Sequence, residues 1–321
     1  RGLGDVYKRQ VDELCDMVAR WMSFSHVWIA LGAFSTTVLS GMWDTTSSLT
    51  DWDGLRVAAW VGVSTGLGYT VQRAIKHTRH PNNMPELRRH FWAKNKWTMV
   101  ATWLAAWALF NWQFRDHLGW DNPGRIEVVG GLALASLVYA AAPGMNGGLR
   151  KVLWLKIPIV AAVWATATTH HPAHGVEPIL WVQRALFIAG LTLPFDIRDL
   201  EVDRRHMTTL PMVKSPEDVL RLARVLLFAS AGLSLLMGVG RMTQGTVDIT
   251  AVGPLVLAAQ CLWALWVLRS SIALEALRSD DEQEKEHYTG WRLDGVLVLP
   301  LSVWGGVHFV LLQLLLMLLL C

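Results

Sequence analysis

Long apolar segments, separated by short polar connections, extend along almost the whole of this chain. A helix needs about 20 mostly apolar residues to cross the hydrocarbon core of a bilayer. Nine segments approach or meet this length, several of them interrupted by Gly or Pro: 21–42, 55–75, 97–114, 126–142, 151–169, 179–195, 219–240, 248–270 and 295–320. The pattern predicts an all-α fold, a polytopic membrane helix bundle of about nine transmembrane helices.

Three connections, 76–96, 196–218 and 271–294, are longer than the others and alternate with short ones. With the N-terminus inside, the inner loops hold seventeen Lys and Arg residues and the outer loops hold four. Cytoplasmic loops of membrane proteins carry such an excess of basic residues. We therefore expect the three longer connections on the cytoplasmic side. The alternation also supports nine spans, because losing one helix would scramble it.

The composition agrees with a membrane protein. Of the 321 residues, 52% are hydrophobic and 17% are charged, whereas soluble domains carry about 25% charged residues. The eighteen Trp residues suit membrane–water interfaces, where Trp is favoured. No basic run interleaved with aromatic residues indicates a nucleic-acid surface. Cys15, Cys261 and Cys321 are too far apart in the chain to suggest a zinc site or a disulfide framework.

The first ten residues, RGLGDVYKRQ, resemble a translated sequencing-library adapter and contain no initiator Met. We therefore treat residues 1–10 as a non-native leader and residues 11–321 as a single transmembrane domain. The chain also ends inside an apolar run, so we expect the natural protein to extend past both ends.

Three carboxylates, Asp196, Asp199 and Asp203, follow the apolar run of the sixth predicted span. Their spacings of three and four residues stack them on one face of a helix, with Arg198, Glu201 and Arg205 on the other side. Like charges on one stripe repel one another, and hard oxygen ligands suit Mg²⁺. Because a helix C-terminus disfavours carboxylates, a bound metal explains the stripe better than a structural role does. The alternative is a solvated helix end with charges of both signs.

The segment FDIRDLEVDRR…TLP resembles the second aspartate motif of the UbiA superfamily of intramembrane prenyltransferases, especially the N/D-x-x-R-D-x-E-x-D-R pattern of its menaquinone-type branch. The stretch LRKVLWLKIPIVAAVW, residues 149–164, is similar to the fifth span of bacterial members. The resemblance covers nearly the whole chain in topology and residues 184–211 in specific sequence. It implies a UbiA-like bundle in which Asp199 and Asp203 are paired Mg²⁺ ligands and Asp196 takes the motif's leading position.

The first aspartate motif of that family, N-x-x-x-D-x-x-x-D, belongs at the inner end of the second span. Here this region reads YTVQRAIKHTRHPNN, with Thr70 in place of Asn and no carboxylate before Glu86. The Gly-Lys that commonly follows the second motif is also absent, and His206 and Met207 occupy its neighbourhood. One of the two metal clamps is therefore missing or rebuilt.

Five basic residues are candidates for substrate binding: Arg73, Lys76, Lys156, Arg198 and Arg204. Arg73 and Lys76 stand where the lost aspartates would be. Our hypothesis is that they contact a diphosphate and partly replace the first metal; the alternative is ordinary positive-inside charge. Lys156, inside the fifth span, either binds a phosphate oxygen or snorkels to the inner surface. Arg198 and Arg204 either bind diphosphate or are solvated.

Other residues have a weaker claim to function. Aromatic candidates for lining an apolar tunnel or shielding an allylic cation, with plain packing as the alternative, are Tyr69, Trp103, Trp107 and Trp164. Arg184 is expected to snorkel at the outer end of the sixth span. The outer loop HHPAHG lies on the wrong side for a shared metal site, and DDEQEKE, residues 280–286, is expected to be a solvated face.

The sequence favours an integral-membrane prenyltransferase. It would move an isoprenoid chain from a prenyl diphosphate to a lipid-soluble, hydrophobic acceptor, with Mg²⁺ as cofactor and Asp196, Asp199 and Asp203 as catalytic metal ligands. We expect it in a bacterial inner membrane, with the aspartates on the cytoplasmic side and no nucleic-acid partner. One alternative is a catalytically degenerate member that binds prenyl lipid. Another is a multi-span transporter, against which no second copy of the aspartate segment is found.

Overall fold

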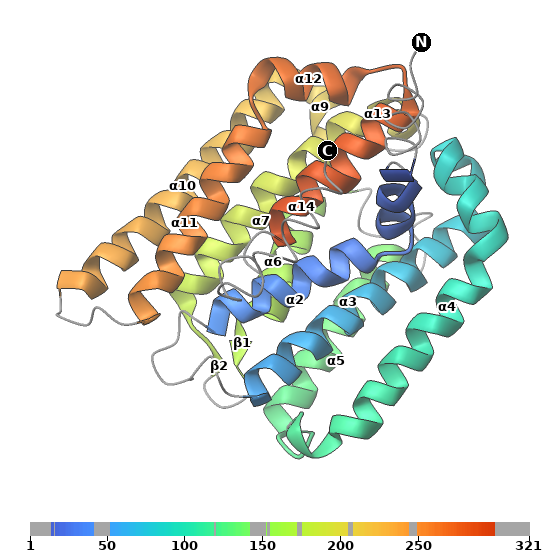
Figure 1. The fold of residues 1–321 in the computed structure, drawn as a ribbon. Helices are drawn as coiled ribbons and strands as arrows, with labels where there is room; N and C mark the ends of the chain where they lie inside the picture. Colours follow the sequence, from blue (N-terminus) through green and yellow to red (C-terminus); the bar gives the residue numbers. More distant parts are fainter. Residues whose placement is uncertain are drawn as a thin grey trace, which may run out of the picture.

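The computed structural model describes residues 14–15, 17–41, 52–118, 120–141, 152, 155–171, 175–204, 208–243 and 249–298. Eight helices form the bundle: α2 (Val27–Gly41), α3 (Trp52–Arg79), α4 (Glu86–Phe114), α5 (Pro123–Ala141), α6 (Lys156–Thr169), α7 (Pro178–Arg198), α10 (Pro216–Thr243) and α11 (Ile249–Val267). In Figure 1, α10 and α11 form one flank, α4 lies at the opposite flank, and α7 packs between α6 and α10. The predicted all-α bundle is confirmed.

Each of the first eight predicted spans coincides with helix, and two of these helices, α7 and α10, are long and apolar enough to cross a bilayer unaided. Two bent pairs also qualify if each forms one span: Met17–Phe24 with α2, and Gly253–Val267 with Ile272–Arg278. The ninth predicted span begins as α14 (Asp294–Val298) and then continues outside the described residues. The count of nine spans stays a prediction.

The first predicted span is broken. Its two halves meet at 69°, and His26 at the break has φ 65°, a left-handed conformation that is uncommon for a residue other than glycine. Trp103 of α4 holds this bend by donating its indole N–H to the Ser25 carbonyl at 2.8 Å. The His26 Nδ1 lies 3.0 Å from the Thr70 hydroxyl. The bend is therefore fixed by α3 and α4.

The longer connections gather at one end of the bundle. They contain η1 (Pro81–Asn83), α8 (Leu200–Asp203), α9 (Leu210–Val213), α12 (Ser270–Arg278), α13 (Glu282–Glu286) and the π-helical η4 (His287–Leu293). Figure 1 shows α9, α12 and α13 at the top and the short antiparallel pair β1 (His170–His171) and β2 (Gly175–Val176) at the opposite end. This arrangement agrees with the predicted alternation of long and short connections. His174 of HHPAHG and the leader 1–10 lie outside the described residues.

Arg184 corrects one expectation. The prediction that it snorkels is wrong, because its side chain is fully buried between α7 and α2. Its Nη2 donates to the Thr36 carbonyl at 3.2 Å and to the Ser40 hydroxyl at 3.0 Å. Hydroxyl-bearing residues of α2 thus supply partners inside the bundle, and burying a polar group without partners would be costly.

Helices α3 and α4 approach closely at Gly66. A Cβ atom placed there would lie 2.3 Å from the Trp103 ring, whereas one at Gly68, on the same helix, would meet nothing within 4 Å. Small residues let membrane helices approach in this way. Gly66 is therefore required by packing and Gly68 is not.

We predict that Gly66→Ala lowers the free energy of unfolding by about 1–3 kcal/mol, because the added methyl group overpacks the α3–α4 contact. Gly68→Ala is the matched control and should be neutral or stabilising by up to about 1 kcal/mol, since Ala favours helix. Thermal unfolding in detergent measures both. Equal effects of the two substitutions would contradict the close approach.

Candidate active site

A cavity of about 670 Å³ lies among α2, α3, α5, α6, α7 and α14. Its size is in the range of small-molecule sites. Helix α3 lines it from Val57 to Arg79, which corresponds to about 33 Å of helix. The cavity therefore extends along much of the bundle and reaches the end where the longer connections gather.

That end of the cavity is densely charged. Six basic side chains line it: Arg73, Lys76, Arg79, Arg88, Lys156 and Arg198. Three aspartates line it with them: Asp199, Asp203 and Asp294. The excess of positive charge favours an anion with several negative charges. Four of the five basic residues predicted to bind substrate meet here; Arg204 is exposed and does not line the cavity.

The body of the cavity is largely apolar and aromatic. Tyr69, Trp107 and Trp164 line it, and Trp164 donates its indole N–H to the Tyr69 hydroxyl at 3.1 Å. Trp107 donates to the Ser64 hydroxyl at 3.1 Å. Trp103, the fourth aromatic candidate, does not line the cavity and instead secures the bend at Ser25.

Asp199 forms an ion pair with its neighbour Arg198. The Arg198 Nε and Nη2 atoms lie 2.7 and 3.0 Å from the two carboxylate oxygens, which is a bidentate pair. The prediction that Arg198 points away from the aspartates is wrong, because α7 ends at Arg198 and Asp199 is not helical (φ −86°, ψ 4°). The break at Asp199 separates α7 from α8, so the helical spacing used for the prediction is interrupted at this point.

The two motif carboxylates in the cavity differ in charge state. Burial by itself would raise the pKa of Asp199, but the Arg198 guanidinium outweighs it and holds that pKa below the usual range. At Asp203, burial and then the charge of Asp199 raise the pKa to about 6. The Asp203 side chain is 6% exposed and has no hydrogen-bond or ion-pair partner among the described residues. A bound cation would favour its ionised form.

Asp196 is separated from the other two motif aspartates. It is buried, does not line the cavity, and forms an ion pair with Lys156 of α6. Lys156 itself lines the cavity, while its ammonium group contacts Asp196. In the described part of the chain, no three His, Cys, Asp or Glu side chains are placed to hold one metal ion. The predicted stripe therefore separates into one structural and two cavity carboxylates.

The two cavity aspartates fit a Mg²⁺ site in which substrate phosphates supply further ligands. This ion is usually bound by one or two carboxylates together with substrate phosphates and water, and not by an all-protein cage. Asp199 and Asp203 both line the charged end and would supply those carboxylates. The residues fit a metal that binds together with a diphosphate better than one held by protein alone.

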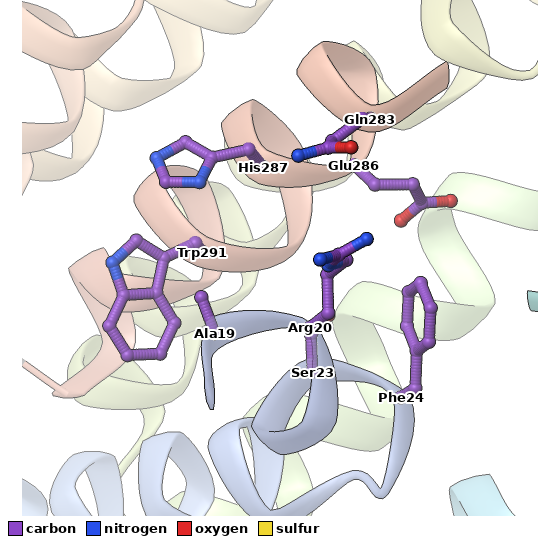
Figure 2. Close-up of a pocket in the computed structure, with 8 residues that line it drawn as sticks. All are labelled: Ala19, Arg20, Ser23, Phe24, Gln283, Glu286, His287 and Trp291. Atoms are coloured by element: carbon purple, nitrogen blue, oxygen red, sulfur yellow. The ribbon is translucent and has the colours of Figure 1, made fainter. Parts of the chain in front are cut away.

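The last long connection is packed onto the site. The prediction that DDEQEKE is solvated is wrong for Glu286, which is 4% exposed and accepts a hydrogen bond from Arg88 at 2.5 Å. Arg198 lies 3.8 Å from Glu286 and donates to the Thr289 hydroxyl at 3.0 Å. Figure 2 shows Glu286 on the side of Arg20 and Phe24, beside a hollow of about 10 Å³, room for one water, which His287 also lines.

The cavity residues missed by the sequence reasoning include His26, Arg79, Arg88 and Asp294. His26 lies in the break of a predicted span. Asp294 carried a detectable signal, since it is a single carboxylate directly before the ninth apolar run.

No family model and no curated protein sequence matches this chain. Its structure is similar to that of a UbiA homolog from Archaeoglobus fulgidus bound to GPP and Mg²⁺, with TM-score 0.56 and 13% identity, over 88% of this chain and 99% of that one. The same homolog bound to DMAPP and Mg²⁺ is similar with TM-score 0.53 and 14% identity, over 88% of this chain and 99% of that one. An apo UbiA homolog from Aeropyrum pernix K1 is similar with TM-score 0.54 and 14% identity, over 87% of this chain and 97% of that one.

The chain therefore has the UbiA fold that the resemblance implied. Its apolar helices and this fold identify it as an integral membrane protein.

The Lys156–Asp196 pair gives a test of the structural assignment. We predict that Lys156→Met destabilises the protein by about 3–5 kcal/mol, because it leaves a buried carboxylate without its partner. The double variant Lys156→Met, Asp196→Leu should recover most of that loss, and thermal unfolding in detergent measures it. The exposed Arg221–Asp218 pair is the control, with an expected coupling below about 1 kcal/mol. Additive effects of the Lys156 and Asp196 substitutions would show that the pair does not interact.

Proposed function

We propose that this chain is an intramembrane prenyltransferase of the UbiA superfamily. It moves an isoprenoid chain from a prenyl diphosphate to a lipid-soluble acceptor in a Mg²⁺-dependent reaction. The observation that carries the proposal is one cavity with a strongly basic end, two motif aspartates and an aromatic, apolar body. The GPP, DMAPP and Mg²⁺ bound in the similar structures support the same substrate class.

The basic end would bind the diphosphate. Arg73 lines the cavity and has no hydrogen-bond or ion-pair partner among the described residues, so its guanidinium is available to an anion. Lys76, one turn further along α3, lines the same wall. Both stand at the position of the family's missing first motif. We propose that their fixed positive charges do part of the work of a first metal.

Asp199 and Asp203 would hold Mg²⁺ next to the diphosphate. When bound, the ion neutralises charge on the leaving group as the C–O bond breaks. Arg198 orients Asp199 through its bidentate contact and is itself held by Thr289 and near Glu286. Lys156 is proposed to bind a phosphate oxygen, with Asp196 as its positioning residue and not as a metal ligand.

The apolar body would take the prenyl chain, and the aromatic residues Tyr69, Trp107 and Trp164 would pack against it. We propose a bacterial inner membrane location with the charged end of the cavity toward the cytoplasm. The basic inner connections support this orientation.

A catalytically degenerate member that binds prenyl lipid is the second candidate. The observation that favours it is that Asp199 and Asp196 each already have a cationic partner in the protein. Turnover separates the two candidates, since a degenerate protein would bind prenyl diphosphate without releasing diphosphate.

The central prediction concerns Asp199 and Asp203. In membranes holding the purified chain, Asp199→Asn and Asp203→Asn should each lower Mg²⁺-dependent diphosphate release from geranyl diphosphate by about 100-fold or more, because the metal loses a ligand. Glu201→Gln is the matched control, since Glu201 lies between them, is exposed and does not line the cavity. Release unaffected by either Asn substitution would eliminate the metal assignment. No release from the wild type with any prenyl diphosphate would favour the degenerate reading.

A second prediction tests the replacement of the first motif. Arg73→Gln should raise the KM for geranyl diphosphate at saturating Mg²⁺ by about tenfold or more, because a charge-assisted contact to the diphosphate is lost. The exposed Arg115→Gln is the control. A normal KM for Arg73→Gln would indicate that Arg73 contributes only positive-inside charge.

A further inference from the structure

Asp294 is a cavity carboxylate that belongs to neither aspartate motif. It is the first residue of α14 and lines the charged end of the cavity. Its side chain has no hydrogen-bond or ion-pair partner in the described part of the chain. Since no three acidic or His side chains there are placed around one metal, Asp294 is not a third ligand beside Asp199 and Asp203.

The backbone that carries Asp294 is held rigidly. Trp291, three residues earlier, stacks on Trp28 with ring centroids 4.3 Å apart, and its carbonyl accepts from the Trp28 indole N–H at 3.2 Å. Tyr288 donates to the Val267 carbonyl at 2.6 Å. The segment before Asp294 is π-helical, a conformation found often at functional sites. A side chain on such a support is preorganised for a fixed contact.

The charges around Asp294 leave it without a counter-ion. Burial raises the pKa of Asp294 to about 7, and the neighbouring Arg88 and Arg198 only partly oppose this while Glu286 adds to it. Arg88 donates a hydrogen bond to Glu286, and Arg198 donates one to Asp199. Tyr69 of α3 lines the same cavity as Asp294. One cavity thus holds a carboxylate with a low pKa, Asp199, and one with a pKa near neutrality, the pattern that separates an ionised ligand from a proton acceptor.

Prenyl transfer to a neutral acceptor releases a proton inside this cavity. The C1–O bond of the donor breaks and its electron pair leaves with the diphosphate. The acceptor supplies the pair for the new bond to C1 and must then lose a proton. Asp199 is a weak base because Arg198 stabilises its ionised form, and Asp203 would be occupied by the metal.

We propose that Asp294 is the general base of this reaction: it accepts a hydrogen bond from a hydroxyl-bearing acceptor and takes its proton as the new bond forms. This rests on the proposed function. A base acts only when it is ionised, so transfer should rise with pH through about 7.

The test uses radiolabelled geranyl diphosphate, Mg²⁺ and the full chain in membranes, with 1-naphthol as the hydroxyl probe and host lipids as a second acceptor pool. Diphosphate release and labelled transfer product are measured separately from pH 5.5 to pH 8.5, a range of about 1.5 units around neutrality. Asp294→Asn should lower transfer by about 100-fold and remove the rise with pH. Diphosphate release should fall less than about threefold, with the label recovered as prenyl alcohol, because the metal site is intact.

Two further variants make the result specific. Asp294→Glu retains a carboxylate and should recover part of the transfer, and Asp280→Asn, exposed in the same connection, should behave as wild type. An infrared pH titration should show a protonated carboxyl that ionises near pH 7 in wild type and Asp280→Asn but not in Asp294→Asn.

Transfer that persists in Asp294→Asn would mean that the leaving diphosphate takes the proton, which overturns the proposal. A parallel loss of release and transfer would also overturn it, because it assigns Asp294 to donor binding or to folding. If the wild type releases no diphosphate, the proposed function itself fails and the base assignment falls with it, whereas a defect confined to the variant concerns Asp294 alone.

Discussion

The need to pair charges that are buried inside a membrane bundle governs this structure. An ionised side chain removed from water is tolerated only with partners. Lys156 pairs with Asp196, Arg198 with Asp199, and Arg88 with Glu286. The first pair joins α6 to α7 and the third joins α4 to α13, and Arg198, 3.8 Å from Glu286, links the two at the charged end of the cavity. The same requirement makes the exceptions informative: Arg73, Asp203 and Asp294 line the cavity without such partners among the described residues.

Much of the fold follows from the sequence because hydrophobic length is a strong constraint in a bilayer. Eight predicted spans coincide with helix, and the three longer connections lie at one end of the bundle. The break at His26 did not follow from hydrophobic length, because a 69° bend in an apolar run is set by contacts from α3 and α4. These contacts join residues that are 44 or more positions apart.

The candidate site was predictable where its residues follow a local motif. Asp199 and Asp203 meet Arg73 and Lys76 in one cavity, as the motif positions indicate. Arg198 did not follow the prediction, because that prediction assumed an unbroken helix past the residue at which α7 ends. Asp196 did not follow it, because it pairs with Lys156 of α6. The burial of Glu286 could not be derived, since it depends on the last connection folding back onto the first helix and α4.

Under the proposed function, Arg73 and Lys76 in place of first-motif aspartates would change how the cavity neutralises a diphosphate. Carboxylates add negative charge and bind the substrate only through metal ions, whereas Arg and Lys contact phosphate oxygens directly. Fixed cations also need no metal to be present when the donor arrives. Under the proposed function, the basic end of this cavity would bind the donor by protein charge, and a metal would be needed only on the Asp199–Asp203 side. A chain that lacks one motif can on this argument keep the chemistry of its fold.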